Sequence, residues 1–357
     1  MKKVVLLRAD GSWDLGLGHV MRCIALAQEL VHRDIKPVFV VKDLDDRASA
    51  IIRTYGFDVK FLKGNGDFDY DRETLMAYVH DCCGQCIVFD LSHGQNLLHK
   101  KRQLESHICS FTEKGIPVVV FDDYDKLDIT SDIQIIPYYG AEKFSYDFPL
   151  GTKGLLGLKY FIFREEFNSR TGNGRTIRPK AKHILIAIGG SDKANVTGQI
   201  VSLIREAYGA KDWDVRVAVG EMASSVHAEE IENKVRELGG QSRCLINIKN
   251  MAELMLWADV VFTGGGLIKY EAAVTGTPNI IVSQGDLEAK RADDYAGTGA
   301  AVHWGQVNRL DKKTFSDIET VMQDEAIRKK MSELGRQLVD TKAGKRIIDE
   351  IESEIFV

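Results

Sequence analysis

The sequence predicts an α/β protein made of two doubly wound lobes in tandem. Apolar runs of strand length alternate with helix-like stretches along most of the 357 residues. The alternation stops once, in the polar and basic stretch NSRTGNGRTIRPKAK at 168–182, and then starts again. A chain of this length can bury two separate cores. We therefore expect one lobe on each side of a linker.

The first half alternates strands and helices from its beginning. Its strand-like runs are apolar throughout, which is typical of parallel strands covered on both faces. In order we expect a strand at 3–9, a helix at 19–32, a strand at 36–42, a helix at 45–55, a strand at 58–62, a helix at 71–82, a strand at 86–90, a helix at 96–115, a strand at 116–123 and short strands at 132–136 and 154–157. We assign residues 1–167 to this N-terminal lobe.

The second half repeats the rhythm after the linker at 168–182. We expect a strand at 183–188, a helix at 193–208, a strand at 214–220, a helix at 227–240, a strand–helix–strand segment at 244–264, a helix at 267–276, a strand at 277–283 and a helix at 286–299. Residues 183–340 form the C-terminal lobe, and 341–357 a final amphipathic helix. Doubly wound folds bind ligands at the carboxyl ends of their strands, so we expect a site in a cleft between the lobes.

The composition is that of an ordinary soluble globular protein. Hydrophobic residues make up 44% and charged residues 28%, and the net charge of −5 gives no general attraction to nucleic acid. No apolar stretch approaches the roughly 18 residues of a membrane span, and the N-terminal run is too short for a signal peptide. We therefore expect a cytoplasmic protein without a membrane span. No pattern indicates an oligomeric state.

Three of the six cysteines lie together in DCCGQC, residues 81–86. A C-x-x-C spacing is found in redox pairs and in half of a zinc site. No second pair or H-x-x-x-H partner accompanies it, and the cluster leads directly into an apolar strand. This favours buried structural thiols over a metal site.

A histidine stands in the first turn of the first helix, after the loop RADGSWDLGLGH. The spacing of Gly16 and Gly18 is not the G-x-G-x-x-G of a dinucleotide site, so we expect no nicotinamide and no other cofactor. A helix start carries partial positive charge, which favours the neutral, proton-accepting imidazole. We interpret His19 as a general base, with Asp10 or Asp14 as the carboxylate that orients it.

Two arginines flank this histidine. Arg8 ends a buried strand and needs a partner, for which Asp10 is the obvious candidate. Arg22 lies one turn after His19 on the same helix face, and either a substrate contact or a salt bridge fits it. Around the linker, Tyr160, Arg164 and Glu165 are expected to make contacts between the lobes.

Two further glycine loops follow strands in the second half. IAIGGSD contains Gly189 and Gly190, and Ser191 or Asp192 can cap the helix that follows. TGGGLIKYE contains Gly265, Gly266 and Leu267. Free N–H groups at a helix start suit a diphosphate, and Glu271, one turn into the helix, is placed to accept from ribose hydroxyls. Such glycines also serve tight turns, but two loops with a placed glutamate favour a nucleotide diphosphate.

These motifs resemble those of PseG-type UDP-sugar hydrolases and their SpsG-like relatives, which are similar to MurG-type GT-B glycosyltransferases. The resemblance reaches to about residue 305 and rests on RADGSWDLGLGHVMRCIALAQEL (8–30), FDDYD, LLGLKYFIFREEF (155–167), IGGSD, NMAELMLWAD (250–259) and TGGGLIKYEAAVTGTP (263–278). It implies a GT-B-like fold of two Rossmann-like lobes, with the sugar in the first lobe and UDP in the second.

The resemblance also implies an activity. Members hydrolyse a UDP-linked 2,4-diacetamido-2,4,6-trideoxy sugar at the anomeric C–O bond, with inversion and without a metal, on the pseudaminic acid route. The histidine that matches His19 activates water, and the glutamate that matches Glu271 holds the ribose. The substrate-binding positions carried over are Gly16, Gly18, Arg22, Gly189, Gly190, Ser191, Asn250, Met251, Gly265, Gly266, Leu267, Glu271 and Glu288.

Three positions depart from the family pattern. Asp90 is followed by Leu91, Ser92 and His93 instead of a His-Tyr pair, Pro137 replaces an asparagine, and Glu288 replaces a glutamine. The first two departures concern the sugar lobe and bear on which sugar is used. The alternatives to hydrolysis are a GT-B glycosyltransferase that uses a UDP-amino sugar donor and a non-catalytic binder of nucleotide sugars.

Overall fold

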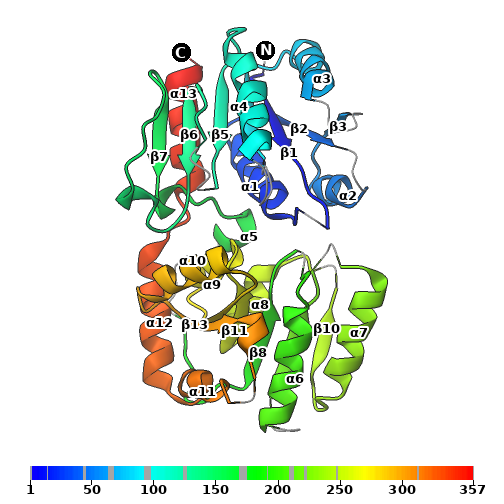
Figure 1. The fold of residues 1–357 in the computed structure, drawn as a ribbon, viewed down its shortest axis with the longest axis vertical. Coiled ribbons are helices and arrows are strands. Elements are labelled where there is room, and N and C mark those ends of the chain that lie inside the picture. Colours follow the sequence, from blue (N-terminus) through cyan, green and yellow to red (C-terminus); the bar gives the residue numbers. More distant parts are fainter. Residues whose placement is uncertain are drawn as a thin grey trace. The chain divides into compact units, whose positions relative to one another are not determined.

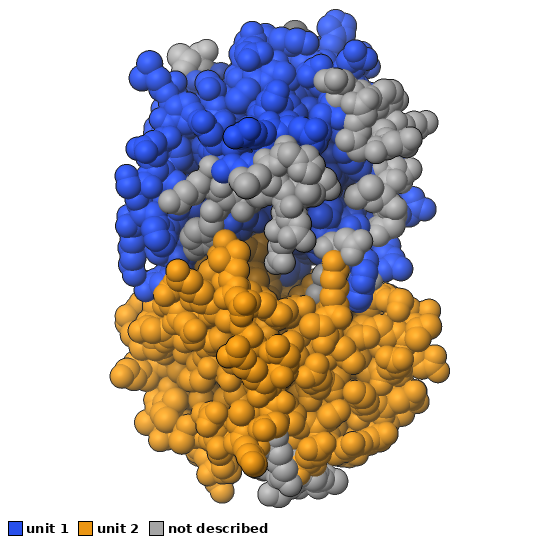
Figure 2. All heavy atoms as spheres, viewed as in Figure 1, with its two compact units in different colours: residues 1–165, 342–357 blue, residues 166–341 orange. Residues whose placement is uncertain are grey.

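A computed structural model describes residues 2–13, 15–42, 46–62, 68–91, 98–123, 127–168, 175–190, 192–208, 213–220, 223–246, 248–311 and 313–356. The chain divides into two compact units (Figure 2). Unit 1 consists of Met1–Glu165 and Lys342–Val357, and unit 2 of Glu166–Thr341. Each unit is built around one parallel sheet with helices on its faces (Figure 1), so the predicted α/β class is confirmed.

The sheet of unit 1 has the strand order β3-β2-β1-β4-β5-β6-β7, and neighbouring strands are parallel. Its strands are β1 (Val4–Ala9), β2 (Lys36–Lys42), β3 (Val59–Leu62), β4 (Cys86–Asp90), β5 (Val118–Phe121), β6 (Ile133–Ile136) and β7 (Lys153–Leu156). The helices between them are α1 (Gly18–His32), α2 (Asp46–Thr54), α3 (Phe68–Asp81) and α4 (Leu98–Thr112). The strands β1, β4, β5 and β6 are buried along their full length, as their uninterrupted apolar sequences predict.

The sheet of unit 2 has the order β10-β9-β8-β11-β12-β13, again with parallel neighbours. Its strands are β8 (His183–Ala187), β9 (Asp214–Ala218), β10 (Arg243–Leu245), β11 (Val260–Gly264), β12 (Asn279–Ser283) and β13 (Ala301–Gln306). The helices are α5 (Glu165–Asn168) at the border, α6 (Val196–Tyr208), α7 (Ser225–Arg236), α8 (Met251–Trp257), α9 (Ile268–Val274), α10 (Asp286–Ala296), α11 (Ser316–Gln323) and α12 (Glu325–Leu338). Among the described residues, the helices are too short or too polar to cross a bilayer.

Each sheet has a point where the strand order reverses direction. In unit 1 the chain moves outward from β1 through β2 to β3 and then returns to β4 on the other side of β1. In unit 2 the same reversal lies between β8 and β11. Loops leave the carboxyl ends of the two strands in opposite directions at such a point, which opens a crevice for a ligand. The predicted motifs after β1, β8 and β11 all lie at these two points.

The C-terminal helix α13 (Ala343–Ile355) belongs to unit 1 (Figure 1). Its Gly344 packs so closely against α1 that an added Cβ would stand 3.1 Å from Glu29. Arg33, just after α1, forms an ion pair of 2.5 Å with Asp349, and Lys153 of β7 pairs with Glu350. The chain therefore leaves unit 1 after Glu165 and returns to it at Lys342.

The described part of the predicted linker is fixed to unit 2. Arg175 donates hydrogen bonds to the carbonyls of Met255 and Ala258 at the end of α8, and Arg178 forms an ion pair of 2.7 Å with Asp259. Burial lowers the pKa of Arg175 to about 10. Two arginines of the predicted linker therefore bind unit 2: Arg175 caps the end of α8, and Arg178 pairs with Asp259.

The cysteine cluster is only partly buried. Cys86 lies in β4 and is buried, Cys82 is half-buried, and Cys83 is exposed in a turn with a positive φ of 52°. The expectation of buried thiols is right for Cys86 and wrong for Cys83, because the strand begins three residues after the turn. Within the described ranges, no group of three metal-ligating side chains is present.

Candidate active site

His19 lies at the reversal point of unit 1, where β1 leads into α1. Gly16 turns the loop with a φ of 76°, and its N–H donates to the carbonyl of Ser12 at 2.8 Å. The helix then begins at Gly18, so His19 is in its first turn, as predicted. The side chain is 11% exposed, so most of the ring is buried while one edge remains open.

The partner of His19 is Asp90, the last residue of β4. His19 Nδ1 and Asp90 Oδ1 are 2.6 Å apart. Ala9 and Asp90 face each other in the β1–β4 register. This pairing places Asp90 beside the loop after β1, so Asp90 meets His19 although 71 positions separate them. A carboxylate only accepts hydrogen bonds, so Nδ1 carries the proton and Nε2 is left to accept one.

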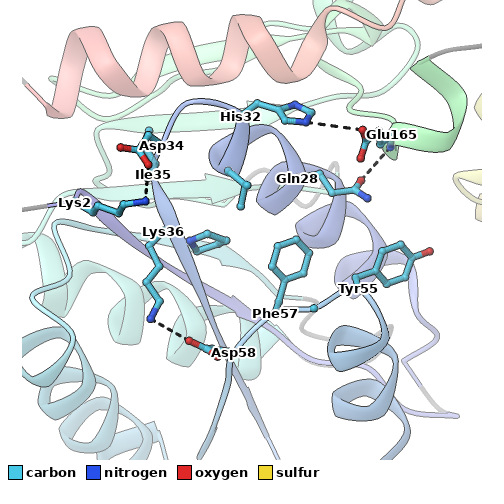
Figure 3. Close-up of a pocket in the computed structure, with 13 residues that line it drawn as sticks. Lys2, Gln28, His32, Asp34, Ile35, Lys36, Tyr55, Phe57, Asp58 and Glu165 are labelled. Atoms are coloured by element: carbon cyan, nitrogen blue, oxygen red, sulfur yellow. Dashed lines mark hydrogen bonds and ion pairs between the residues drawn. The ribbon is translucent and has the colours of Figure 1, made fainter.

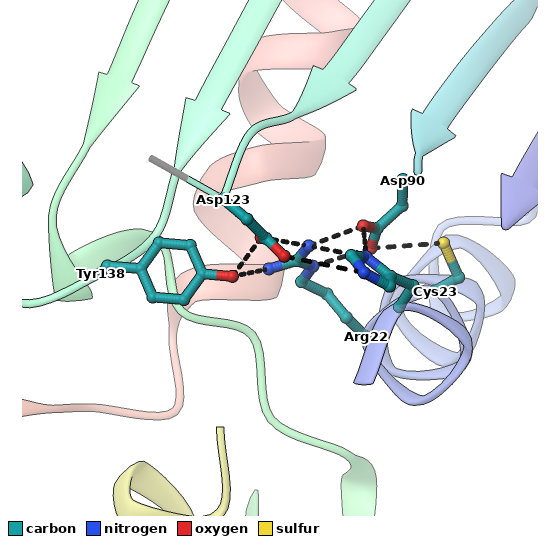
Figure 4. A network of polar contacts seen from close by, with 6 residues as sticks. Arg22, Cys23, Asp90, Asp123 and Tyr138 are labelled. Atoms are coloured by element: carbon teal, nitrogen blue, oxygen red, sulfur yellow. Dashed lines mark hydrogen bonds and ion pairs between the residues drawn. The ribbon is translucent and has the colours of Figure 1, made fainter. Parts of the chain in front are cut away.

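Arg22 donates hydrogen bonds to two carboxylates, Asp90 at the end of β4 and Asp123 after β5. Its Nε and Nη2 donate to the two oxygens of Asp90 at 2.7 and 2.6 Å, a bidentate arrangement. Nη2 also donates to Asp123 at 2.8 Å, and Nη1 donates to the hydroxyl of Tyr138 at 2.7 Å (Figure 4). Of the two interpretations left open for Arg22, the structure supports the salt bridge, but it is buried rather than on the surface.

Asp123 is the most exposed member of this cluster, and it is half-buried. It follows β5 and accepts from Tyr138 as well as from Arg22. Its side chain is 29% exposed, and Oδ2 lies 3.7 Å from Nε2 of His19. That distance is too long for a direct hydrogen bond, and it leaves both atoms able to contact one hydroxyl or water.

The electrostatics of His19 differ from the prediction. Burial alone lowers its pKa, but the charges of Asp90 and Asp123 outweigh that effect and raise the pKa above the ordinary value. The helix start is expected to favour the neutral imidazole, but the two carboxylates shift the pKa of His19 in the opposite direction. In the same cluster, Arg22 and His19 outweigh burial and hold the pKa of Asp123 well below its ordinary value.

Asp10 has another role than orienting His19. Its two oxygens accept from Arg8 at 2.5 and 2.7 Å, and Oδ1 also accepts from the backbone N–H of Lys42 at 2.8 Å. The predicted Arg8–Asp10 pair is confirmed. The assignment of Asp10 as the orienting carboxylate is wrong, since Asp90 takes that place, and the alternative, Asp14, lies outside the described residues.

A pocket at the other end of α1 is separate from this cluster. It is lined by His32, Lys36, Tyr55 and their neighbours (Figure 3), and its charges are paired, as in Lys36–Asp58 at 3.0 Å. His32 lies thirteen positions after His19 on the helix, about 20 Å along its axis at 1.5 Å per position. The predicted site residues in the described ranges are not among those that line this pocket.

The predicted glycine loops of unit 2 meet at its reversal point. Ala187 of β8 faces Thr263 of β11, so Gly189 and Gly190 come to lie beside the loop at 264–266. An added Cβ at Gly264 would stand 2.6 Å from the carbonyl of Ile188, and one at Gly220 would stand 2.5 Å from the carbonyl of Gly190. Gly264 and Gly220 are therefore required for close approach of neighbouring backbone.

Two glycines in these loops have open space before them. A Cβ at Gly189 or Gly266 would meet no atom within 4 Å, and Gly189 has a φ of 133°. Leu267 precedes α9 without a side-chain cap, and Glu271 lies half-buried in the first turn of that helix. Asp192 caps α6 through the N–H groups of Val196 and Thr197, as predicted, and Ser191 lies outside the described residues.

The predicted binding residues Asn250, Met251 and Glu288 form hydrogen bonds with other residues of the protein. Asn250 caps α8 by accepting from Glu253 at 3.0 Å, and the N–H of Met251 donates to Glu166. Glu288 accepts from the N–H groups of Gly265 and Gln284, both at 2.7 Å. The Glu288 carboxylate thus lies directly on the glycine loop after β11.

Solved structures identify the fold. The two units together have the GT-B glycosyltransferase fold. The crystal structure of Acinetobacter baumannii MurG aligns with a TM-score of 0.65 at 15% identity, covering 98% of this chain and 99% of that one. The spinosyn forosaminyltransferase SpnP aligns with a TM-score of 0.67 at 12% identity, covering both chains fully. A UDP co-structure of S. aureus MnaA aligns with a TM-score of 0.66 at 12% identity, covering 99% and 96%.

Sequence relatives are more specific. The chain is 25% identical over 337 residues to the spore coat polysaccharide biosynthesis protein SpsG of Bacillus subtilis, covering 94% of this chain and 93% of SpsG. It is 27% identical over 325 residues to the uncharacterized protein MJ1062 of Methanocaldococcus jannaschii, which covers 88% of this chain but only 62% of that longer protein. No family model matches the chain. The predicted likeness to SpsG and MurG is confirmed.

Proposed function

We propose that the protein hydrolyses a UDP-linked amino sugar at the anomeric C–O bond in surface polysaccharide or nonulosonic acid biosynthesis. The observation that carries the proposal is the His19–Asp90 pair, with Nε2 open at the carboxyl end of a parallel sheet. The similarity to SpsG supports a role in polysaccharide biosynthesis. The fold shared with a UDP co-structure supports a UDP-sugar substrate. The resemblance to PseG-type enzymes points to a diacetamido-trideoxy sugar.

In this proposal unit 1 supplies the base. Neutral His19 takes a proton from water through Nε2, while its Nδ1–H stays hydrogen-bonded to the Asp90 carboxylate. The water oxygen forms a bond to the anomeric carbon, and the bond from that carbon to the diphosphate oxygen breaks. The electron pair leaves with UDP, and the configuration at the carbon inverts. Asp123 lies 3.7 Å from Nε2 and orients the same water or a sugar hydroxyl.

Unit 2 supplies the nucleotide site in this proposal. The loops at 188–190 and 264–266 contact the diphosphate, and Glu271 accepts from the ribose hydroxyls. The support is the meeting of the two loops at one reversal point and the open space at Gly266. Close approach of a diphosphate also explains why position 266 is a glycine, although no protein atom would clash with a Cβ there.

Replacing Gly266 with alanine tests the nucleotide site. The added Cβ meets no protein atom within 4 Å, so the folding stability is expected to stay the same. UDP affinity, measured by calorimetry, is expected to fall about tenfold or more, at least ~1.4 kcal/mol. Gly297→Ala, at the exposed end of α10 with a φ of −57°, is the matched control and keeps wild-type affinity. Unchanged affinity in Gly266→Ala rules out close approach of UDP to this loop.

Glycosyl transfer is the second candidate function. Several UDP-N-acetylglucosamine-dependent transferases are related to part of the chain, for example that of Stutzerimonas stutzeri at 28% identity over 170 residues, covering 46% of this chain and 47% of that one. Incubation with a UDP-diacetamido-trideoxy sugar and no acceptor separates the two. A hydrolase releases free sugar and UDP in equal amounts. Intact UDP-sugar after incubation, with release only on adding an acceptor, establishes the transferase instead.

A further inference from the structure

Lys269 is a buried lysine next to the glycine loop after β11. The residue is 4% exposed and lies near the start of α9. Its Nζ donates to the carbonyls of Gly265 and Gly266, the second at 3.0 Å. Tyr270 lies beside it, with Nζ 4.5 Å from the ring centroid. Within the described ranges, the hydrogen bonds of this ammonium therefore go to main-chain carbonyls rather than to a carboxylate.

Glu288 holds the same loop from the α10 side. Its carboxylate accepts from the N–H of Gly265, while Lys269 donates to the carbonyl of Gly265. The backbone of one glycine is thus held by a carboxylate at its N–H and by an ammonium at its carbonyl. A Cβ at Gly265 would stand 2.4 Å from Glu288, so this packing also requires the glycine.

The charges facing Lys269 are unbalanced. From α10, Glu288 favours the ammonium and Arg291 disfavours it. From α12, Arg336 lies against Gly276, beyond the far end of α9, and Glu271 is on the same helix as Lys269. Burial dominates and lowers the pKa of Lys269 to about 7. An anion on the outer side of the loop adds the missing negative charge, and by linkage it strengthens proton binding to Nζ.

We propose that Lys269 balances the charge of the nucleotide site, and that its Nζ takes up a proton from solvent when a nucleoside diphosphate binds to the loop at 264–266. This inference rests on the proposed nucleotide site. Arriving diphosphate competes with the Glu288 carboxylate for the N–H of Gly265, so the buried ammonium also compensates for that displacement. UDP therefore binds more weakly as the pH rises and Lys269 loses its proton.

Calorimetry of UDP binding at pH 7.5 in buffers of different ionisation enthalpy tests the inference. The slope of the heat against ionisation enthalpy gives the protons taken up, and we expect roughly half a proton from Lys269 in the wild type. Lys269→Met is expected to lose this uptake and to bind UDP about tenfold more weakly. Lys269→Arg keeps a charge that does not titrate, so it binds UDP without this uptake.

Two further measurements complete the test. Lys290→Met removes an exposed lysine of α10 and keeps the wild-type uptake, which controls for net charge. Lys269→Arg also separates loss of the proton from failure to fold, since thermal unfolding reports its folded state independently. Equal proton uptake in wild type, Lys269→Met and Lys269→Arg overturns the inference while the nucleotide site stands. Wild-type protein that fails to bind UDP overturns the proposed site and the inference with it.

Discussion

Replacing His19 with asparagine is expected to lower the rate of UDP release by roughly 10²- to 10⁴-fold, the usual contribution of a general base. Asparagine can still donate to Asp90, so the cluster keeps its hydrogen bond while the proton acceptor is lost. UDP affinity is expected to remain at the wild-type level, because the proposed nucleotide site is built from unit 2. Release of UDP from the sugar nucleotide, followed by chromatography, measures the rate.

The pH profile gives this prediction a second readout. Asp90 and Asp123 raise the pKa of His19 against the effect of burial, and only the neutral imidazole accepts a proton. The rate is therefore expected to rise with pH and to level off at a pH above the ordinary histidine value of about 6.5. His32→Asn, at the exposed end of the same helix, keeps the wild-type rate and profile. A His19→Asn enzyme with near-normal turnover removes His19 from the mechanism.

Asp90→Asn is expected to have the largest effect on stability. Asp90 is fully buried and accepts two hydrogen bonds from Arg22, whose guanidinium is also buried. Removing one partner of a buried ion pair typically costs ~3–5 kcal/mol, and a loss near the lower end is expected here because Arg22 keeps its ion pair with Asp123. Denaturant unfolding of this variant measures the loss. Asp81→Asn, which changes an exposed carboxylate at the end of α3, is the control and stays within about 0.5 kcal/mol of wild type.

The sign of the pH dependence follows from His19. Its pKa is raised in the folded state, so its protonation stabilises the fold fully below the unfolded pKa of about 6.5. That contribution is lost as the pH rises through the folded pKa. Asp90→Asn removes the carboxylate that raises the pKa of His19 most strongly, so its destabilisation is expected to be larger at pH 6 than at pH 9. An effect that is equal at both pH values contradicts the assigned pair.

Local patterns were enough to predict the elements and one member of the His19–Asp90 pair. Uninterrupted apolar runs predict buried parallel strands, and the glycine loop before a helix identifies His19. The Arg8–Asp10 pair was also predictable, because the two residues lie on one strand end. Asp123 and Tyr138 were not, since they reach Arg22 from 101 and 116 positions away and only the sheet register brings them together.

A usable signal for Asp90 was present in the sequence. It is an acid that ends an otherwise apolar strand, and β4 pairs with β1 when the strand order reverses. The resemblance drew attention to the residues after it instead. An acid at or directly after the end of a buried strand is a candidate partner for the loop after β1. The same criterion also selects the acid pair at 122–123, which directly follows β5. The return of the chain to unit 1 through α13 has no comparable local signal.

That return makes unit 2 an insertion within unit 1, because the segment Glu166–Thr341 is bracketed by residues of the other unit. Proteins emerge from the ribosome in sequence order, and N-terminal domains usually fold first. In this chain the N-terminal unit is the last to be completed, because its final helix follows unit 2 in the sequence. The helix that packs against Glu29 and Arg33 is translated only after all of unit 2, so unit 1, which carries His19, stays unfinished while unit 2 can already close its core.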